Sequence, residues 1–145
     1  YYNFLRLGKD GYKRIMNNIM DNAQYLEQKL LETGYFELLN ESKYLPTVTV
    51  RLKDRELPDK VVYLLSDLLR EYGWIVPAYP LPPKADTVHV LRMVVKENFS
   101  RDMAEKFAAD IQACIDKLNT LAGDFEAYFE KAKAKGQTKT KGRVC

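Results

Sequence analysis

Proline placement constrains this chain more than any other feature of its sequence. Four prolines occur within seven residues, in the run Pro77-Ala78-Tyr79-Pro80-Leu81-Pro82-Pro83. Proline fixes its own φ angle and has no backbone N–H, so this run cannot continue a helix or supply the hydrogen bonds of a central strand. We therefore expect residues 77–83 to form a stiff, extended loop between two short elements.

Three segments place apolar side chains at the three- and four-residue steps that are typical of helices. The first segment runs to Gly34, which is a credible helix stop. The second ends at Gly73, and the third follows Ser100, a residue type that is favoured as an N-cap. The composition changes after Gly123, and Gly136 would interrupt any helix that begins in the tail.

Four segments fit short strands, because β-branched and aromatic residues are frequent in them. They are Tyr35–Leu39, Pro46–Leu52, Trp74–Val76 and Val88–Val95. The resulting order is helix, two strands, helix, two strands, helix. This order predicts an α+β fold of two layers, in which helices cover a sheet that is antiparallel or mixed. We expect the first helix to be additional to this unit.

Composition excludes several classes of protein. With 46% apolar and 30% charged residues, the chain is typical of a soluble globular protein. No apolar run approaches the roughly 20 residues of a membrane helix, so we expect no membrane partner. Cys114, Cys145 and the single His89 leave no metal cluster, and so few cysteines fit a reducing, cytoplasmic setting. The first methionine is Met16, which suggests a piece of a longer chain.

Arg92 is the residue that most suggests a binding function. Strand alternation places it with Val90 and Val94, on one face of the most apolar predicted strand. A buried guanidinium without a partner would cost several kcal/mol, so we expect an anionic group to meet it. Two interpretations stay open: an ion pair with an acidic residue of a helix, and a planar fork for a substrate carboxylate, for which arginine is better suited than lysine.

The other residues offer little catalytic chemistry. His89 falls on the opposite face of the same strand, and no serine or cysteine nucleophile motif lies near it, so we interpret it as structural. The phosphate-binding motifs G-x-G-x-x-G and G-x-x-x-x-G-K-[ST] do not occur in the sequence. No pair of carboxylates has a spacing that favours acid–base catalysis. From its residues alone, the chain is a binding or regulatory piece.

Several longer motifs resemble a known family. The first is Tyr1-Tyr2-Asn3-Phe4-Leu5-Arg6-Leu7-Gly8-Lys9-Asp10-Gly11-Tyr12. The second is Tyr72-Gly73-Trp74-Ile75-Val76-Pro77-Ala78-Tyr79, followed by Leu81-Pro82-Pro83. The third is Val90-Leu91-Arg92-Met93-Val94-Val95 with Glu97-Asn98-Phe99-Ser100-Arg101. In this order they resemble the C-terminal small domain of glutamate decarboxylase, in the form that plant enzymes use, over roughly residues 1–120.

The resemblance implies a fold and an activity. The fold is the small domain of the aspartate aminotransferase type, and the enzyme depends on pyridoxal 5'-phosphate to convert L-glutamate into 4-aminobutyrate and CO2. Residues 1–34 would be the connector helix to a large domain, and residues 35–121 the small domain. Active sites of this family lie between the domains and at a dimer interface, so the implied partners are the large domain and a second subunit.

The resemblance also assigns residues. Arg92 occupies the position of an arginine that binds a substrate carboxylate. The Schiff-base lysine of the family follows a histidine, and no His-Lys pair occurs in this sequence. Covalent catalysis needs that lysine. We therefore expect the cofactor to be bound mainly by the large domain, no catalytic residue in this chain, and no activity of the chain alone.

Residues 122–145 form a basic tail. The net charge of +3 comes from residues 124–145, where six basic residues outnumber three acidic ones. The tail resembles the calmodulin-binding extension of plant glutamate decarboxylases, with aromatic anchors, lysines and a terminal Val144-Cys145. The candidate binding residues are Phe125, Tyr128, Phe129, Lys131, Lys133 and Lys135. Such a helix suits the apolar groove that Ca²⁺ opens in calmodulin.

Two alternatives stay open. The tail could be a solvated, disordered extension; its dispersed basic residues would give nucleic acids only salt-sensitive, nonspecific affinity, so we expect no nucleic-acid partner. The chain could also be a stand-alone, non-catalytic interaction or regulatory module. The apolar stretch of residues 1–7 distinguishes this alternative from a decarboxylase domain. A stand-alone module should cover the stretch with its own core, whereas a severed domain should leave it exposed.

Overall fold

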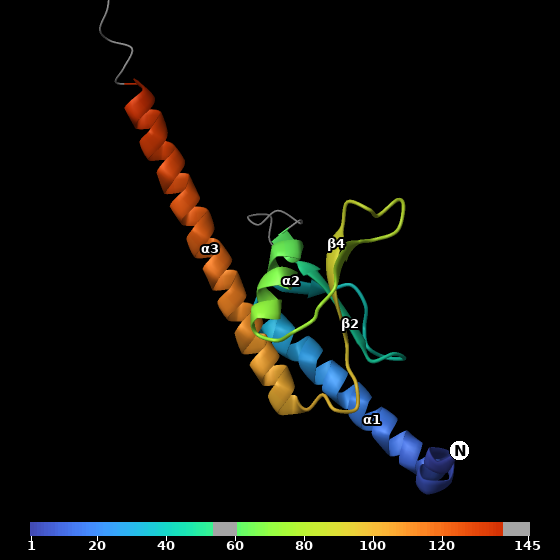
Figure 1. Ribbon diagram of the computed structural model, residues 1–145. Coiled ribbons are helices and arrows are strands. Elements are labelled where there is room, and N and C mark those ends of the chain that lie inside the picture. The colour runs from blue at the N-terminus through green and yellow to red at the C-terminus, as the bar shows by residue number, and fades with distance from the viewer. Residues whose placement is uncertain (54–60, 138–145) are drawn as a thin grey trace, which may run out of the picture.

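The computed structural model describes the backbone of residues 1–53 and 61–137, and the side chains of residues 1–53 and 61–121. In chain order the elements are α1 (Tyr2–Glu32), β1 (Phe36–Leu38), β2 (Thr47–Leu52), α2 (Val61–Glu71), β3 (Ala78–Pro80), β4 (His89–Val94) and α3 (Arg101–Gln137). The order of helices and strands is the predicted one, and the fold is the α+β type with two layers (Figure 1).

The strands form one sheet in the order β1-β2-β4-β3, and every neighbouring pair is antiparallel. The helices pack on one face of this sheet, and no described helix covers the other face (Figure 1). In β2 the alternate residues Val48, Val50 and Leu52 are buried against the helices, whereas the residues between them are partly exposed. The alternation therefore distinguishes a packed face from an open face.

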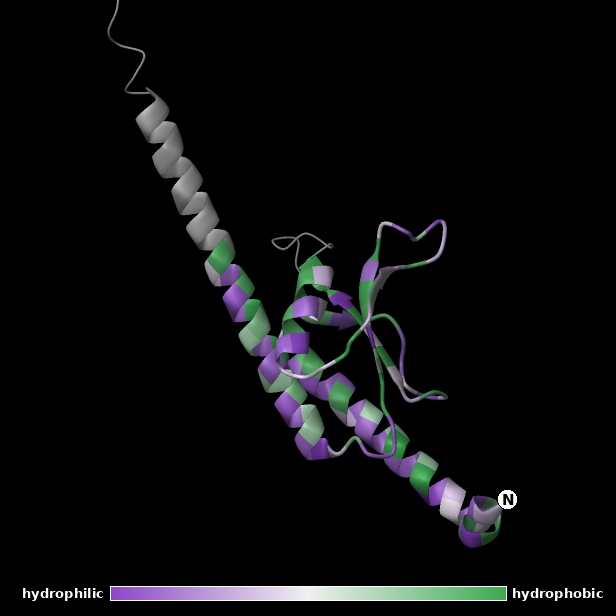
Figure 2. Cartoon of the chain, in the orientation of Figure 1, coloured by the Kyte–Doolittle hydropathy of each residue, from purple (hydrophilic) through white to green (hydrophobic). Residues whose placement is uncertain are grey.

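The core lies between the packed face and all three helices. Its fully buried members from α2 and α3 include Val62, Leu65, Leu69, Phe107, Ile111 and Ile115. The second half of α1 contributes Ala23, Leu26 and Leu30, at the spacing of one helix face. The expectation that the first helix is additional to the unit is therefore wrong for this half. Hydrophobic and hydrophilic residues alternate along α1 in Figure 2.

The segment around the proline run differs from the prediction. The predicted strand at residues 74–76 is not a strand, and β3 lies inside the run that we expected to be a loop. β3 pairs with β4 and forms an edge of the sheet. A proline is tolerated at such an edge, because its absent N–H is not needed for a hydrogen bond to a neighbouring strand. The Val76 carbonyl accepts a hydrogen bond from the Ser66 hydroxyl of α2 instead of joining the ladder.

The helix ends also differ from the prediction. α3 continues through Gly123 and Gly136 to Gln137, and it projects far beyond the sheet (Figure 1). A glycine in a helix costs about 1 kcal/mol relative to alanine but leaves the N–H available for the helical bond, so it weakens a helix without ending it. Conversely, α1 is kinked at Gly8, whose φ of 57° lies in the left-handed region.

Among the described residues, no helix is long and apolar enough to span a membrane.

Candidate functional site

Arg92 lies near the middle of β4, on the open face of the sheet. Its cross-strand partner is Thr49 of β2. Its side chain is exposed, and Val94 on the same face is 55% exposed. The expectation that Arg92 is buried is therefore wrong. Strand alternation grouped the correct residues on one face, but in a two-layer fold the helices cover only the other face.

The guanidinium of Arg92 lies over the ring of Tyr79, 5.3 Å from the ring centroid. Tyr79 belongs to the edge strand β3 and pairs with Val90, which lies two residues before Arg92 on the same face. Val90 is fully buried although no helix packs on this face. The Tyr79 ring and the Arg92 side chain thus form a small platform on the open face, held by a cation–π contact.

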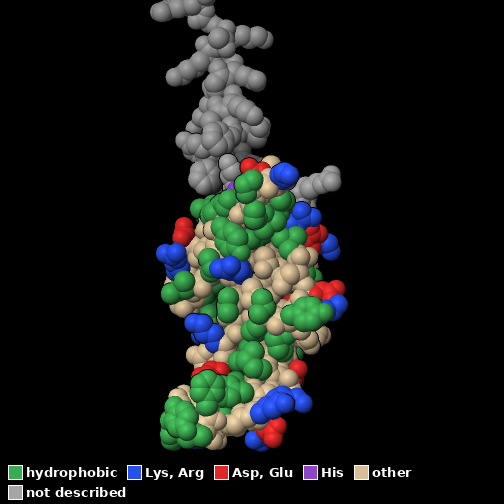
Figure 3. Space-filling view, turned by 90° about the vertical axis from the view of Figure 1, so that its right-hand side faces the viewer, with side chains coloured by type: hydrophobic (Ala, Val, Ile, Leu, Met, Phe, Trp, Pro, Cys, Tyr) green, Lys and Arg blue, Asp and Glu red, His purple; other side chains and the backbone are tan. Residues whose placement is uncertain are grey.

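Arg92 makes no ion pair with any residue in the ranges 1–53 and 61–121. On the same face, Arg51 of β2 and Glu37 of β1 pair with each other. The ion-pair interpretation of Arg92 therefore finds no support in the described part of the chain. Figure 3 views the molecule from the open side of the sheet and shows basic side chains among apolar ones, with acidic side chains toward the margins.

His89 lies on the packed face and contacts α2. Its Nδ1 atom is 2.9 Å from the hydroxyl of Tyr63, and the two rings meet edge to face with centroids 5.4 Å apart. This contact agrees with the structural role predicted for His89. It also separates His89 from Arg92, since the two side chains leave the strand on opposite faces.

Cys114 offers no nucleophile to this site. Cys114 is buried in the core, and burial raises the pKa of its thiol, which disfavours the reactive thiolate. Cys145 lies outside the described residues. In the described part of the chain, no three His, Cys, Asp or Glu side chains are grouped so that they could hold a metal ion.

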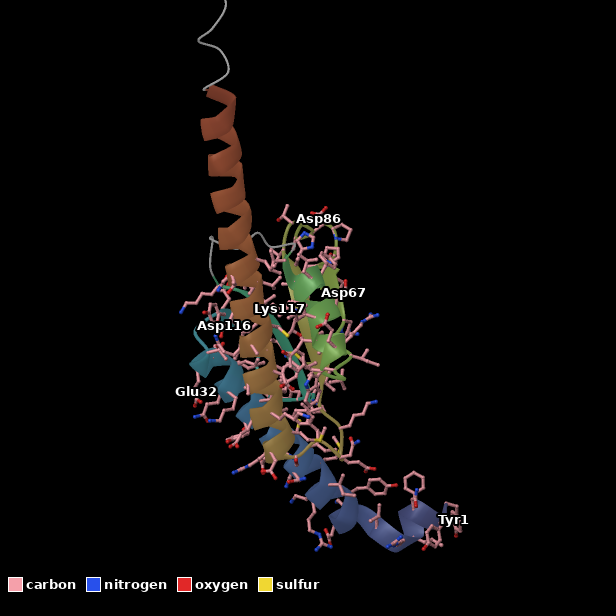
Figure 4. The ribbon with its side chains drawn as sticks, turned by 60° about the vertical axis from the view of Figure 1, so that its left-hand side comes forward. Tyr1, Glu32, Asp67, Asp86, Asp116 and Lys117 are labelled. Atoms are coloured by element: carbon pink, nitrogen blue, oxygen red, sulfur yellow. The ribbon has the colours of Figure 1, made fainter. Side chains whose placement is uncertain are left out.

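The first residues of α1 are strongly exposed. Tyr1 is 91% exposed, Tyr2 70% and Phe4 68%. The ring of Phe4 pairs with the ring of Tyr12, which also belongs to α1, and the two ring centroids are 5.5 Å apart. Figure 4 shows Tyr1 and Glu32 at opposite ends of α1, with Tyr1 beyond the sheet and the other helices. This apolar end of the helix is not covered by any described residue of the chain.

The calmodulin-binding candidates do not come close to the sheet. Their backbone belongs to the projecting part of α3, and their side chains lie outside the described residues. The residues are Phe125, Tyr128, Phe129, Lys131, Lys133 and Lys135.

Comparison with known proteins shows which proteins share this sequence and fold. No family model matches the chain. Glutamate decarboxylase of Petunia hybrida is 39% identical over 140 residues, which are 94% of this chain and 28% of that protein. Glutamate decarboxylase beta of Listeria monocytogenes is 43% identical over 119 residues, 82% of this chain and 26% of that protein. The chain is homologous to part of glutamate decarboxylase. It spans about a quarter of the length of the relatives that it matches.

A solved structure confirms the relation to glutamate decarboxylase. The enzyme of Lactobacillus brevis superposes with a TM-score of 0.77 at 38% identity, over 81% of this chain and 27% of that one. Tryptophan decarboxylase of Catharanthus roseus shares the fold, with a TM-score of 0.69 at 18% identity. The predicted fold class, a small α+β domain of the aspartate aminotransferase type with a long first helix, is confirmed.

Some matches to plant glutamate decarboxylases also extend into the tail. The Petunia protein aligns with 94% of this chain, and glutamate decarboxylase 3 of Arabidopsis thaliana aligns with 97%. Alignments of this coverage necessarily include most of residues 124–145. The Listeria match covers only 82% of the chain.

Proposed function

We propose that this chain is the C-terminal portion of a cytoplasmic, pyridoxal-phosphate-dependent glutamate decarboxylase, which converts L-glutamate into 4-aminobutyrate and CO2. The observation that carries the proposal is the 38–43% identity to glutamate decarboxylases over most of the chain. In this proposal residues 1–34 connect to a large domain, residues 35–121 form the small domain, and the large domain and a second subunit are the partners.

The exposure of residues 1–7 favours this proposal over a stand-alone module. A module that functions by itself would bury its aromatic residues, because exposed apolar patches promote association. Here Tyr1, Tyr2 and Phe4 are strongly exposed, and Tyr1 lies at the end of α1 that extends away from the core (Figure 4). Their position suits a helix that enters from, and packs against, another domain.

Arg92 is the residue that we assign to the substrate. Its guanidinium is accessible on the open face, and its fork of N–H donors can bind a carboxylate of glutamate through two parallel hydrogen bonds. Pyridoxal phosphate, when bound, supplies the electron sink for the pair released as the bond to the α-carboxylate breaks. No residue of this chain is assigned to the cofactor, since the sequence has neither a His-Lys pair nor a phosphate-binding glycine motif.

The proposal is tested by kinetics of the full-length enzyme that contains this chain. Arg92→Lys should keep the fold and lose most of the turnover of L-glutamate, because a lysine cannot form the bidentate pair. Wild-type turnover in this variant would overturn the substrate role of Arg92. The 145-residue chain mixed with L-glutamate and pyridoxal phosphate should release no CO2. Release of CO2 would contradict the assignment of the catalytic lysine to a large domain.

We also propose that residues 124–145 bind Ca²⁺-loaded calmodulin. Three features support this regulation: the aromatic and basic composition of the tail, its alignment with plant relatives, and the helical backbone of α3 through Gln137. Calorimetry with calmodulin should show binding in Ca²⁺ and none in a chelator. Deletion of residues 124–145 should abolish the binding, whereas binding that survives the deletion, or none in Ca²⁺, would refute the role of the tail.

A further inference from the structure

We propose that Tyr79 is a positioning residue, which holds the Arg92 guanidinium on the open face of the sheet in the orientation that binds a carboxylate. The inference deepens the proposed function and rests on the substrate role of Arg92. Its basis is the 5.3 Å distance between the guanidinium carbon of Arg92 and the centroid of the Tyr79 ring.

The backbone fixes the two residues relative to each other. The N–H of Arg92 donates to the Pro77 carbonyl at 3.1 Å, and the N–H of Leu81 donates to the Val88 carbonyl at 2.9 Å. These bonds join β3 and β4 on both sides of Tyr79. The backbone of Tyr79 is therefore held by hydrogen bonds to β4, the strand that contains Arg92.

Proline makes β3 stiffer than an ordinary edge strand. Tyr79 directly precedes Pro80, and a residue before proline is restricted to extended backbone conformations. Pro77 and Pro80 themselves have a fixed φ angle. An isolated edge strand frays easily, whereas this one carries the tyrosine on a restrained backbone. The proline run, which we expected to form only a loop, thus restrains the strand that carries Tyr79.

The cation–π contact orients Arg92 without using its hydrogen-bonding capacity. The ring attracts the cation electrostatically and offers no oxygen acceptor, so the ring does not use the strong hydrogen-bonding capacity that the guanidinium needs for a carboxylate. A carboxylate of the protein at the same place would hold the guanidinium equally well but would occupy its fork. Val90 is fully buried on the same face, paired with Tyr79 and two residues from Arg92 in β4, so the platform stands on an apolar position of the strand.

This reasoning separates the ring of Tyr79 from its hydroxyl. Tyr79→Phe keeps the aromatic face and should preserve the position of Arg92. Tyr79→Leu removes the aromatic face and should release the guanidinium. Tyr79→Val is a second variant without a ring, chosen because a β-branched residue suits an edge strand. Tyr44→Leu is the matched control, since Tyr44 is 90% exposed and has no aromatic or cationic contact in the described part of the chain.

The first measurement uses NMR on the 145-residue chain. The δ protons of Arg92, assigned by comparison with the Arg92→Lys spectrum, should be shifted upfield by the ring current in the wild type and in Tyr79→Phe. The shift should vanish in both variants without a ring and remain in Tyr44→Leu. Absence of a ring-current shift in the wild type overturns the inference without any variant having to fold.

The second measurement uses the full-length decarboxylase and separates KM from kcat. An exposed cation–π contact corresponds to about two- to fivefold in binding, so KM for L-glutamate should rise by that factor in Tyr79→Leu and Tyr79→Val, with a smaller change in kcat. Tyr79→Phe should restore the wild-type KM. If Arg92→Lys abolishes turnover while KM is unchanged in both ringless variants, the inference fails and the proposed function stands. If Arg92→Lys has no effect, the proposed role of Arg92 itself fails.

Discussion

Replacement of Phe107 by alanine tests the packing between the helical layer and the rest of the domain. Phe107 lies on α3, is 2% exposed, and meets the single tryptophan, Trp74, edge to face at 5.1 Å between ring centroids. Truncation of a buried phenylalanine to alanine removes its burial and leaves a cavity, which costs about 3–5 kcal/mol. Domains of ordinary size have a free energy of unfolding of about 5–15 kcal/mol, so we expect a large part of the stability to be lost.

Urea denaturation measures this loss. With an m value of about 2 kcal/mol/M, the unfolding midpoint of Phe107→Ala should fall by about 1.5–2.5 M. Because Trp74 is the only tryptophan, its fluorescence reports directly on the aromatic contact, and circular dichroism reports on the helices in the same samples. The two signals should give coincident transitions if the domain unfolds in one step.

A second phenylalanine provides the control. Phe4 lies at the exposed end of α1 and is 68% exposed, so Phe4→Ala should change the free energy of unfolding by less than about 0.5 kcal/mol. A loss below about 1 kcal/mol for Phe107→Ala would refute the core described here, as would an equal loss for both variants.

Three further predictions concern groups in the core or between helices. Asn22 of α1 donates to the Phe99 carbonyl at 2.7 Å, so Asn22→Ala should cost about 1–3 kcal/mol in urea denaturation. The hydrogen bond from Tyr25 to the Glu105 carboxylate, and then burial, raise the pKa of Tyr25. The bond should therefore stabilise the fold below the ordinary pKa of tyrosine and be lost as the pH rises through the raised value, so Tyr25→Phe should flatten the alkaline fall in stability. Burial raises the pKa of Cys114, so its thiol should react with a disulfide reagent near neutral pH only when the chain unfolds.

Each of these has a simple control. Asn18 lies at an exposed position one helical turn before Asn22, so Asn18→Ala should hardly change the free energy of unfolding. An equal loss at both positions would contradict the role of the buried amide. An unchanged alkaline profile in Tyr25→Phe would contradict the carboxylate contact. In a Cys145→Ser background only one thiol remains, and its rapid reaction in native conditions would show that Cys114 is not buried as described.

The sequence predicted element types well, because helical spacing and glycine stops are local properties. Where prediction failed, the deciding interaction was between segments distant in sequence. The pairing of Tyr79 with Val90 makes residues 78–80 a strand, and a proline run gives no local sign of the partner that accepts it. At Gly136 the failure was of another kind, since a weak helix former was expected to interrupt a helix and instead lies within α3.

Arg92 shows the same limit at the site. Alternation correctly placed it with Val90 and Val94, but alternation cannot tell which face of a sheet the helices will cover. That choice depends on the register of the sheet and on the packing of all three helices. The contact between Arg92 and Tyr79 depends on the same register. The sequence alone therefore gave no indication that these two residues lie close together.

The open face explains why the proposed site needs more than this chain. A two-layer fold leaves one face of its sheet uncovered, and here that face carries an accessible arginine, a tyrosine that contacts it and an exposed valine. An arginine on an open surface binds a carboxylate weakly, because water competes for its N–H donors. In the proposed function, closure by a second domain would remove that water, strengthen the ion pair and bring the Schiff-base lysine and the cofactor to the substrate. The exposed side chain of Arg92, which contradicted the first expectation, is therefore what a site between two domains requires.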